Sequence, residues 1–157
     1  MLDVKPFRQR SEFCGPACLK MVLGYYGVRK SEKELARLAN YTKSKGASAE
    51  NLLRAARKFG FKGMIKDFAE IKDIKEYILR KKIPVIVPWF SVYEDHYSVV
   101  VDIGKDSIYL QDPELGHLRA MKVDRFKLLW FDLQLGDKPL KSRDQVIIRR
   151  LIAISPK

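Results

Sequence analysis

The sequence predicts an α+β fold, with helices in the first half of the chain and antiparallel strands in the second. Two patterns predict this class. Up to about residue 82, apolar residues recur at helical spacing between capping residues and glycines. From residue 84 onward, short apolar runs rich in valine and isoleucine alternate with turn residues. With 157 residues, 46% of them hydrophobic, the chain is long enough to bury a single core.

The first expected helix begins at Gly15-Pro16, because proline suits the first turn of a helix, and it ends at Gly27. Its residues are apolar nearly all round, which is typical of a helix buried at the centre of a domain. A capping box of Ser31 and Glu34 opens the second helix. The third and fourth helices span about residues 48–59 and 71–82.

The expected strands of the second half span residues 84–87, 96–103, 107–111 and 118–123. The middle two are expected to pair as a hairpin around Lys105. Asp124 is expected to cap a short helix that follows the last of these strands. The polar, proline-containing segment 136–143 is expected to be a linker. Residues 145–154 then form a terminal strand or helix, between which their apolar pairs do not decide.

Charge and hydropathy narrow the classes of function. The net charge of +12 favours anionic partners or serves solubility. The basic residues are scattered over the expected helices without a recognition motif, so specific nucleic-acid binding is not expected. No apolar run approaches the roughly 18 residues that cross a bilayer, and the N-terminus lacks the apolar core of a signal peptide. The chain is therefore expected to be cytoplasmic.

Cys14 is the most informative single position, because it stands directly before Gly15-Pro16 at the start of the buried helix. A thiol there lies at the positive end of the helix dipole, which favours the thiolate, the nucleophilic form of cysteine. The alternative interpretation is a small buried residue at a helix start. Cys18 lies one helical turn further on, within the apolar stretch, and is expected to be a core residue.

Three other residues complete a candidate catalytic set with Cys14. His96 opens a strand, where its imidazole can reach a thiolate and act as general base and acid. The hairpin brings Asp112 near His96, where a carboxylate can hold the imidazole in one tautomer. The Gln9 amide can join the Cys14 backbone N–H in an oxyanion hole. The simpler alternatives are a structural histidine, a turn-forming Asp-Pro pair and a polar loop residue. His117 is a second candidate base.

Three blocks of sequence, taken together, resemble the double-glycine peptidases, a family of bacteriocin-processing cysteine peptidases. The blocks are residues 9–27 with Cys14-Gly15-Pro16, residues 46–60, and residues 96–104 followed by Asp112-Pro113 and Trp130. They occur in the family's order and cover about residues 4–133. The resemblance implies a papain-like fold in which N-terminal helices pack on a C-terminal antiparallel sheet.

The resemblance also implies a role for each of the four candidate residues. Cys14 would be the nucleophile, and His96 would be the general base and acid. Asp112 would orient the imidazole, and Gln9 would donate to the oxyanion. The implied reaction, which needs no cofactor and no metal, cleaves a peptide bond after small residues, such as the Gly-Gly of a leader peptide.

The resemblance further implies an organisation and a set of partners. Residues 1–133 would form the peptidase domain, and residues 134–157 a C-terminal extension of unknown role. The substrate would be a peptide or a precursor protein. Many family members are the N-terminal domain of a peptide-exporting transporter. This sequence has no membrane span and no phosphate-binding glycine-rich loop, so a separate exporter would be the partner.

Two other interpretations stay open. The chain is a catalytically silent relative that binds leader peptides in the same groove, or it is a basic nucleic-acid-binding domain. A complete set of Cys, His, Asp and Gln argues against silence, because a binding module needs none of them. A zinc site built from Cys14, Cys18, His96 and His117 is not expected, because the spacing of these residues fits no standard ligand pattern.

Overall fold

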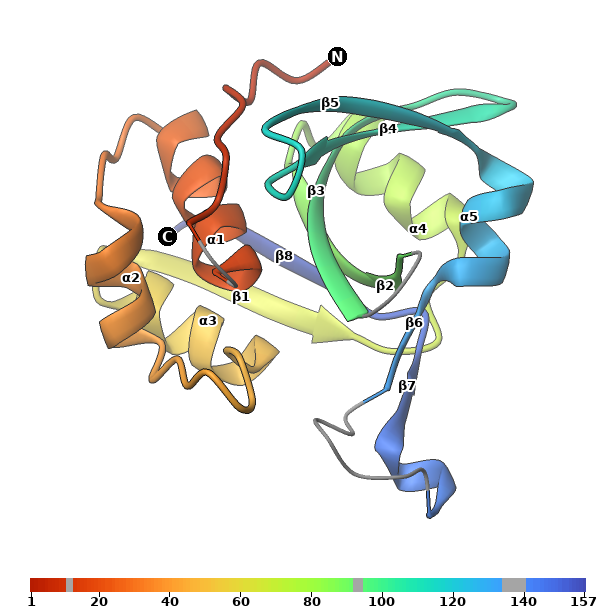
Figure 1. Ribbon diagram of the computed structural model, residues 1–157. Helices are drawn as coiled ribbons and strands as arrows, with labels where there is room; N and C mark the ends of the chain where they lie inside the picture. The colour runs from red at the N-terminus through yellow and green to blue at the C-terminus, as the bar shows by residue number, and fades with distance from the viewer. Residues whose placement is uncertain (11–12, 92–94, 134–140) are drawn as a thin grey trace.

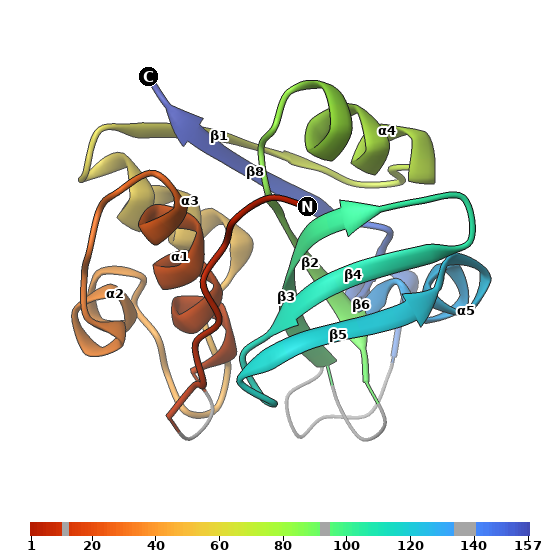
Figure 2. The ribbon, with the colours of Figure 1, turned by 90° about the horizontal axis from the view of Figure 1, so that it is seen from above.

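The computed structural model describes residues 1–10, 13–91, 95–133 and 141–157, and it confirms the α+β class. The N-terminal helices are α1 (Cys14–Tyr25), α2 (Glu32–Leu38) and α3 (Ala49–Arg57). They pack together against a six-stranded antiparallel sheet (Figures 1 and 2). This is the predicted arrangement of N-terminal helices on an antiparallel sheet.

The six-stranded sheet has the order β1-β8-β2-β3-β4-β5, and every neighbouring pair is antiparallel. Its strands are β1 (Phe61–Lys66), β2 (Val85–Phe90), β3 (Asp95–Ile103), β4 (Ser107–Asp112), β5 (His117–Lys122) and β8 (Leu151–Pro156). Two short strands, β6 (Phe131–Leu133) and β7 (Val146–Ile148), form a separate pair. The remaining elements are α4 (Ile71–Lys75), the π-helical turn η1 (Glu76–Arg80), α5 (Val123–Leu129) and the 3-10 turn η2 (Arg143–Gln145).

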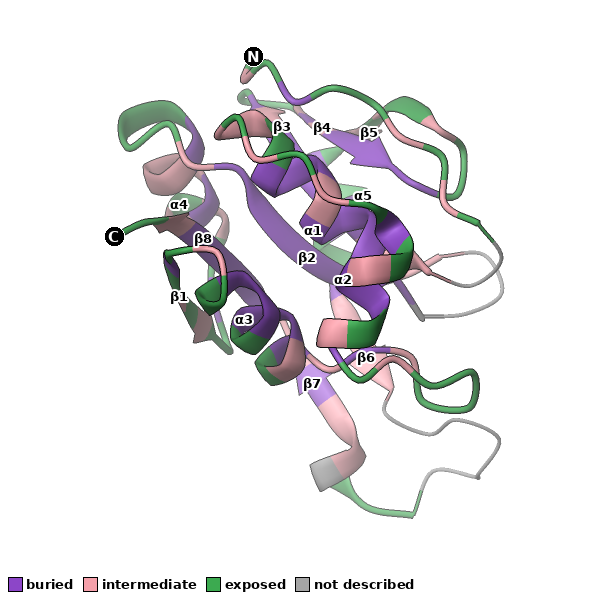
Figure 3. Cartoon of the chain, turned by 90° about the vertical axis from the view of Figure 1, so that its left-hand side faces the viewer, coloured by how far each residue is buried: buried purple, intermediate pink, exposed green. Residues whose placement is uncertain are grey.

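Two apolar clusters cover the two faces of the sheet, because neighbouring residues of a strand point to opposite faces. On β2, Ile86 packs with the α1 cluster, whereas Val85 packs with the cluster that contains Ile74 of α4 and Phe126 of α5. Figure 3 shows the burial of β2 between these layers. The hairpin of β3 and β4 is thereby fixed from both sides, which positions its ends.

Helix α1 is the buried helix that its composition predicts. Leu19, Val22 and Leu23 are fully buried, and most of the helix has no contact with solvent. Gly27 ends this segment with a φ of +86°, a value that glycine adopts without strain. The expected caps are also present, since the hydroxyl of Ser31 accepts a hydrogen bond from the Glu34 backbone N–H at 3.1 Å.

The C-terminal part of the chain, which was expected to form an extension at residues 134–157, contributes a strand to the main sheet. Strand β8 lies between β1 and β2, so the end of the chain contributes an interior strand to the main sheet. A strand buried on both faces has no polar alternation, and Leu151-Ile152-Ala153-Ile154 shows none. This is why the apolar pairs in the sequence did not decide between strand and helix. Most of the linker expected at 136–143 lies outside the described residues.

Two smaller expectations also differ from the structure. Strand β1 was not predicted, because its sequence carries two lysines and a glycine, and Phe61 is its only buried residue. Asp124 lies in the first turn of α5 rather than at its cap, which is Lys122. Among the described residues, no helix is long and apolar enough to cross a membrane.

Candidate active site

Cys14 is the first residue of α1, and the structure brings it to the imidazole of His96. The side chain of Cys14 is partly buried and within hydrogen-bonding reach of His96. The helix places it there, because α1 packs against β3, the strand that carries His96 near its start. The thiol therefore lies at a helix N-terminus and beside a histidine, as the sequence predicts.

His96 and Asp112 form a buried hydrogen bond across the hairpin of β3 and β4. The distance between His96 Nε2 and Asp112 Oδ1 is 2.6 Å, and both side chains are almost completely buried. Burial lowers the pKa of His96, but the hydrogen bonds with Asp112 and Cys14 outweigh this effect and raise the pKa to about 9. At neutral pH the imidazole is therefore protonated, with Nε2–H donating to the carboxylate.

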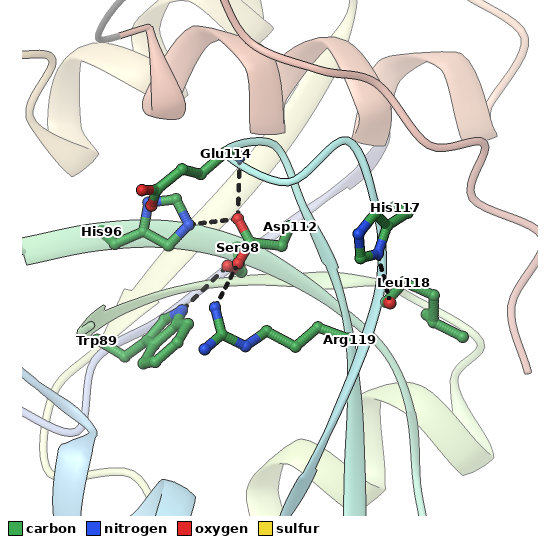
Figure 4. A network of polar contacts seen from close by, with 8 residues as sticks. All are labelled: Trp89, His96, Ser98, Asp112, Glu114, His117, Leu118 and Arg119. Atoms are coloured by element: carbon green, nitrogen blue, oxygen red, sulfur yellow. Dashed lines mark hydrogen bonds and ion pairs between the residues drawn. The ribbon is translucent and has the colours of Figure 1, made fainter. Parts of the chain in front are cut away.

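Asp112 is held by three donors (Figure 4). Besides His96, its Oδ1 accepts the Glu114 backbone N–H at 2.9 Å, and its Oδ2 accepts from Arg119 Nη1 at 3.0 Å. Burial acts to raise the pKa of Asp112, but these three donors outweigh it and lower the pKa below its ordinary value. The buried carboxylate therefore stays ionised.

Trp89 of β2 packs against the other side of this network. Its ring meets the His96 imidazole edge to face, with centroids 5.7 Å apart, and its Nε1–H donates to Ser98 Oγ at 3.0 Å. The Arg119 guanidinium lies over the same indole at 5.0 Å from the centroid. The imidazole is thus supported by an aromatic ring as well as by a carboxylate.

Gln9 lies beside the turn that follows Asp112. Its backbone N–H donates to the carbonyl of Pro113 at 2.7 Å. The next residue, Arg10, donates its N–H to the buried carboxylate of Glu32 at 3.0 Å. These two bonds fix the segment that leads towards α1, although residues 11–12 of the first sequence block lie outside the described residues.

The other candidates do not join this site. Cys18 is completely buried in the core, as predicted, and burial raises the pKa of its thiol well above the ordinary value. His117 is exposed on β5 and lies apart from the His96–Asp112 pair, with its Nδ1 3.0 Å from the Leu118 carbonyl oxygen (Figure 4). A zinc site that needs both Cys18 and His117 is therefore not formed.

A different set of possible metal ligands includes Glu114. One ligand atom each from His96, Asp112 and Glu114 lies within 4.8 Å of the others. In the direct 2.6 Å hydrogen bond to Asp112, His96 Nε2 carries the proton, so this nitrogen has no lone pair to offer an ion. Glu114 Oε2 is 3.7 Å from His96 Nδ1, and its side chain is half exposed. The geometry is that of an oriented imidazole rather than of a metal centre.

Sequence reasoning missed Arg119. If strands β4 and β5 had been taken as a second hairpin, counting alternate residues would have found Arg119, because it pairs with Leu110, two residues before Asp112 on β4. Paired residues point to the same face of a sheet. Arg119 and Asp112 therefore share a face.

The profile of the peptidase C39 family matches residues 5–138. The chain belongs to the peptidase C39 family. This membership confirms the resemblance to the double-glycine, bacteriocin-processing peptidases. The matched range includes all four candidate residues, from Gln9 to Asp112.

Two relatives differ in how much of their own length matches this chain. The C39 chain is 29% identical over 152 residues to the lactococcin-G-processing and transport ATP-binding protein LagD of Lactococcus lactis, covering 95% of this chain but 20% of LagD. It therefore spans about a fifth of the length of LagD. It is also 37% identical over 132 residues to an uncharacterized protein of Methanothermobacter marburgensis, covering 78% of this chain and 85% of that protein.

Solved structures share the fold of this C39 chain. The peptidase domain of Streptococcus ComA, described as a bifunctional ABC transporter of a quorum-sensing pathway, has a TM-score of 0.74 at 21% identity, covering 98% of this chain and 99% of that one. A double glycine motif protease from an AMS/PCAT transporter, in complex with its leader peptide, has a TM-score of 0.73 at 21% identity, covering 99% and 94%. At these identities the comparison establishes the fold.

Proposed function

We propose that the chain is a cysteine peptidase with Cys14, His96 and Asp112 as its triad. The observation that carries the proposal is the buried 2.6 Å hydrogen bond between His96 and Asp112, with the Cys14 side chain on the same imidazole. A nucleophile, a base and a group that orients the base are the three parts that covalent acyl transfer requires.

In the first step, the Cys14 sulfur attacks the carbonyl carbon of the scissile bond. A sulfur–carbon bond forms, and the carbonyl electron pair moves onto oxygen. The backbone N–H at the start of α1 has no acceptor within the helix and is available to this oxygen. The Gln9 side-chain amide is the second donor in this proposal, and the Gln9 backbone N–H, which donates to the Pro113 carbonyl, holds the residue beside the turn that follows Asp112.

In the second step, His96 transfers the proton of Nδ1, the nitrogen not bonded to Asp112, to the leaving amine. The carbon–nitrogen bond breaks and leaves an acyl-thioester on Cys14. The neutral imidazole then takes a proton from water, whose oxygen attacks the thioester and releases the acid and the thiolate. Asp112 stays ionised throughout and stabilises the imidazolium.

The proposed substrate is a peptide cleaved after small residues, with the Gly-Gly of a leader peptide as the leading candidate. This rests on family membership, because LagD is a processing and transport protein and the AMS/PCAT protease was solved with a leader peptide. We propose a peptide exporter as the partner. We also place the activity on the cytoplasmic side, from which such an exporter takes its cargo.

The assembled charges favour this function over silent peptide binding. A buried imidazolium and a buried carboxylate both lose hydration, and their mutual attraction often only repays that cost. A groove that only binds a leader peptide gains nothing from such a pair beside a thiol. Nucleic-acid binding is supported by the net charge of +12 alone.

The test is a panel of leader-like peptides with Gly-Gly, Gly-Ala or bulky pairs at the cut position. We expect the wild-type chain to cleave the Gly-Gly peptide at the pair, as identified by the masses of both products. Cys14→Ala is expected to bind the same peptide with similar affinity and to cleave none of it. If the wild type binds these peptides but leaves all of them intact, the chain is a silent relative.

A further inference from the structure

Arg119 of β5 contacts the oxygen of Asp112 that His96 does not use. Its Nη1 donates to Asp112 Oδ2 at 3.0 Å, while Oδ1 faces the imidazole. The Asp112 side chain has no exposed surface, whereas the Arg119 side chain is 29% exposed. A guanidinium at the surface thus reaches inward to a buried carboxylate.

We propose that Arg119 is a positioning residue of the peptidase reaction, which holds Asp112 so that one oxygen always faces His96. The inference rests on the proposed function, since it concerns the same triad. A carboxylate turns about its Cβ–Cγ bond unless both oxygens are held. The Glu114 N–H holds Oδ1, and among the described residues Arg119 is the donor that holds Oδ2.

A second contact links Arg119 to the imidazole by another route. The guanidinium lies over Trp89, and the edge contact of Trp89 with His96 supports the ring from the side. His96, Asp112, Arg119 and Trp89 therefore form a closed ring of contacts, of which Figure 4 marks the hydrogen bonds of Asp112 with His96 and Arg119. Its members come from the four adjacent strands β3, β4, β5 and β2. Arg119 joins the two supports of the imidazole, so its loss loosens both.

The pH at which Asp112 titrates distinguishes a charge effect of Arg119 from a packing effect, because it depends on the charges around the carboxylate. The ionisable groups near the carboxylate are His96 on β3, Arg119 on β5, Glu114 in the following turn, and Cys14 and Cys18 on α1. Burial raises the pKa of Asp112, and the Arg119 hydrogen bond is one of the interactions that lower it. Removing the guanidinium therefore moves the titration of Asp112 to higher pH.

The experiment compares Arg119→Met, which keeps the aliphatic stem without the charge, with Arg119→Lys, which keeps a charge. Arg125→Met is the matched control. Arg125 is exposed, and like Arg119 it lines a pocket beside Trp89. For Arg119→Met we expect kcat on a Gly-Gly peptide to fall about 10- to 100-fold with KM within about threefold. We expect Arg119→Lys to keep much of the wild-type kcat. We expect guanidine added to Arg119→Ala to restore much of kcat, and Arg125→Met to have the wild-type kcat.

The second measurement is the carboxyl carbon-13 titration of Asp112 by NMR, which needs no substrate. We expect an upward shift in Arg119→Met and none in Arg125→Met. If the wild type cleaves no peptide, the proposed function fails, while this titration still decides whether Arg119 controls Asp112. Unchanged kcat with an unchanged Asp112 titration in Arg119→Met overturns the proposal. If Arg119→Met does not fold, the other variants decide. The proposal is overturned if Arg119→Lys folds but loses kcat and guanidine does not restore the kcat of Arg119→Ala.

Discussion

His96 Nε2 lies 2.6 Å from Asp112 Oδ1, and this hydrogen bond joins the two strands of one hairpin, β3 and β4. The register of the hairpin therefore sets the direction of the imidazole. The second imidazole nitrogen is left for the Cys14 thiol, which arrives from a different element, α1. The geometry of the proposed triad thus depends on one local pairing and one packing contact between a helix and the sheet.

Removal of the Asp112 charge should lower the pKa of His96 while leaving the imidazole in place. In Asp112→Asn the amide oxygen can still accept from Nε2, but burial, which lowers the pKa of His96, is no longer opposed by a carboxylate. We expect the pKa of His96 to fall from about 9, because only the interactions with Cys14 then still raise it, and kcat/KM to fall about 100-fold. Imidazole NMR titration checks the pKa. A His96 that still titrates near 9 in Asp112→Asn would contradict this account of its electrostatics.

The raised pKa of His96 also predicts how stability depends on pH. The folded chain holds the imidazole proton more tightly than the unfolded chain, whose histidine titrates near 6.5. The contribution is therefore fully present below pH 6.5 and is lost as the pH rises through about 9. Its size is on the order of 3 kcal/mol, because each pKa unit corresponds to about 1.4 kcal/mol.

Urea unfolding of the wild type at pH 6.5 and pH 9 measures this loss. His96→Gln serves as the reference, because its side chain does not titrate. We expect the wild type to lose more unfolding free energy than His96→Gln between the two pH values. An equal loss in both proteins would mean that His96 titrates alike in the folded and unfolded chains.

Gln9→Ala should lower turnover without weakening substrate binding. If the Gln9 amide donates to the oxyanion, its loss affects a charge that exists only in the transition state, so kcat should fall about 100- to 1000-fold with little change in KM. Lys5→Ala is the control, because Lys5 is exposed on the same N-terminal segment. Steady-state kinetics on one Gly-Gly peptide compare the three proteins. A rise in KM at constant kcat would assign Gln9 to ground-state binding instead.

The two cysteines should react with iodoacetamide at very different rates. Cys14 is partly exposed at a helix start beside an imidazolium, whereas Cys18 is completely buried with a raised pKa. At neutral pH we expect alkylation at Cys14 and almost none at Cys18 in the folded protein, as measured by peptide mass mapping over time. Similar rates at both sites, or faster labelling of Cys18, would remove Cys14 as the nucleophile.

The sequence predicted the local features of this fold well, because each has a short-range physical cause. The apolar composition of α1, the serine cap of α2, and the hairpin that joins His96 to Asp112 were all predicted. Each depends on residues that are close together in the chain.

The features that were missed depend on which strands pair with one another. Strand β8 pairs with β1, about ninety residues earlier in the chain, and no local pattern marks that partner. Arg119 reads as one more surface cation among 31 basic residues until the β4–β5 register places it on the face of Asp112. The pairing of strands, rather than residue type, decides both cases.

The most direct test of the central claim, that Cys14 is the nucleophile of the triad, is to trap the acyl-thioester. The wild-type chain is mixed with a Gly-Gly leader-like peptide, quenched in acid within the first turnover, and digested for mass spectrometry, with Cys14→Ala treated in parallel. We predict that the Cys14 fragment gains the mass of the N-terminal part of the substrate, and that Cys14→Ala shows neither adduct nor products. An adduct on another residue, or cleavage by Cys14→Ala at the wild-type rate, would contradict the claim.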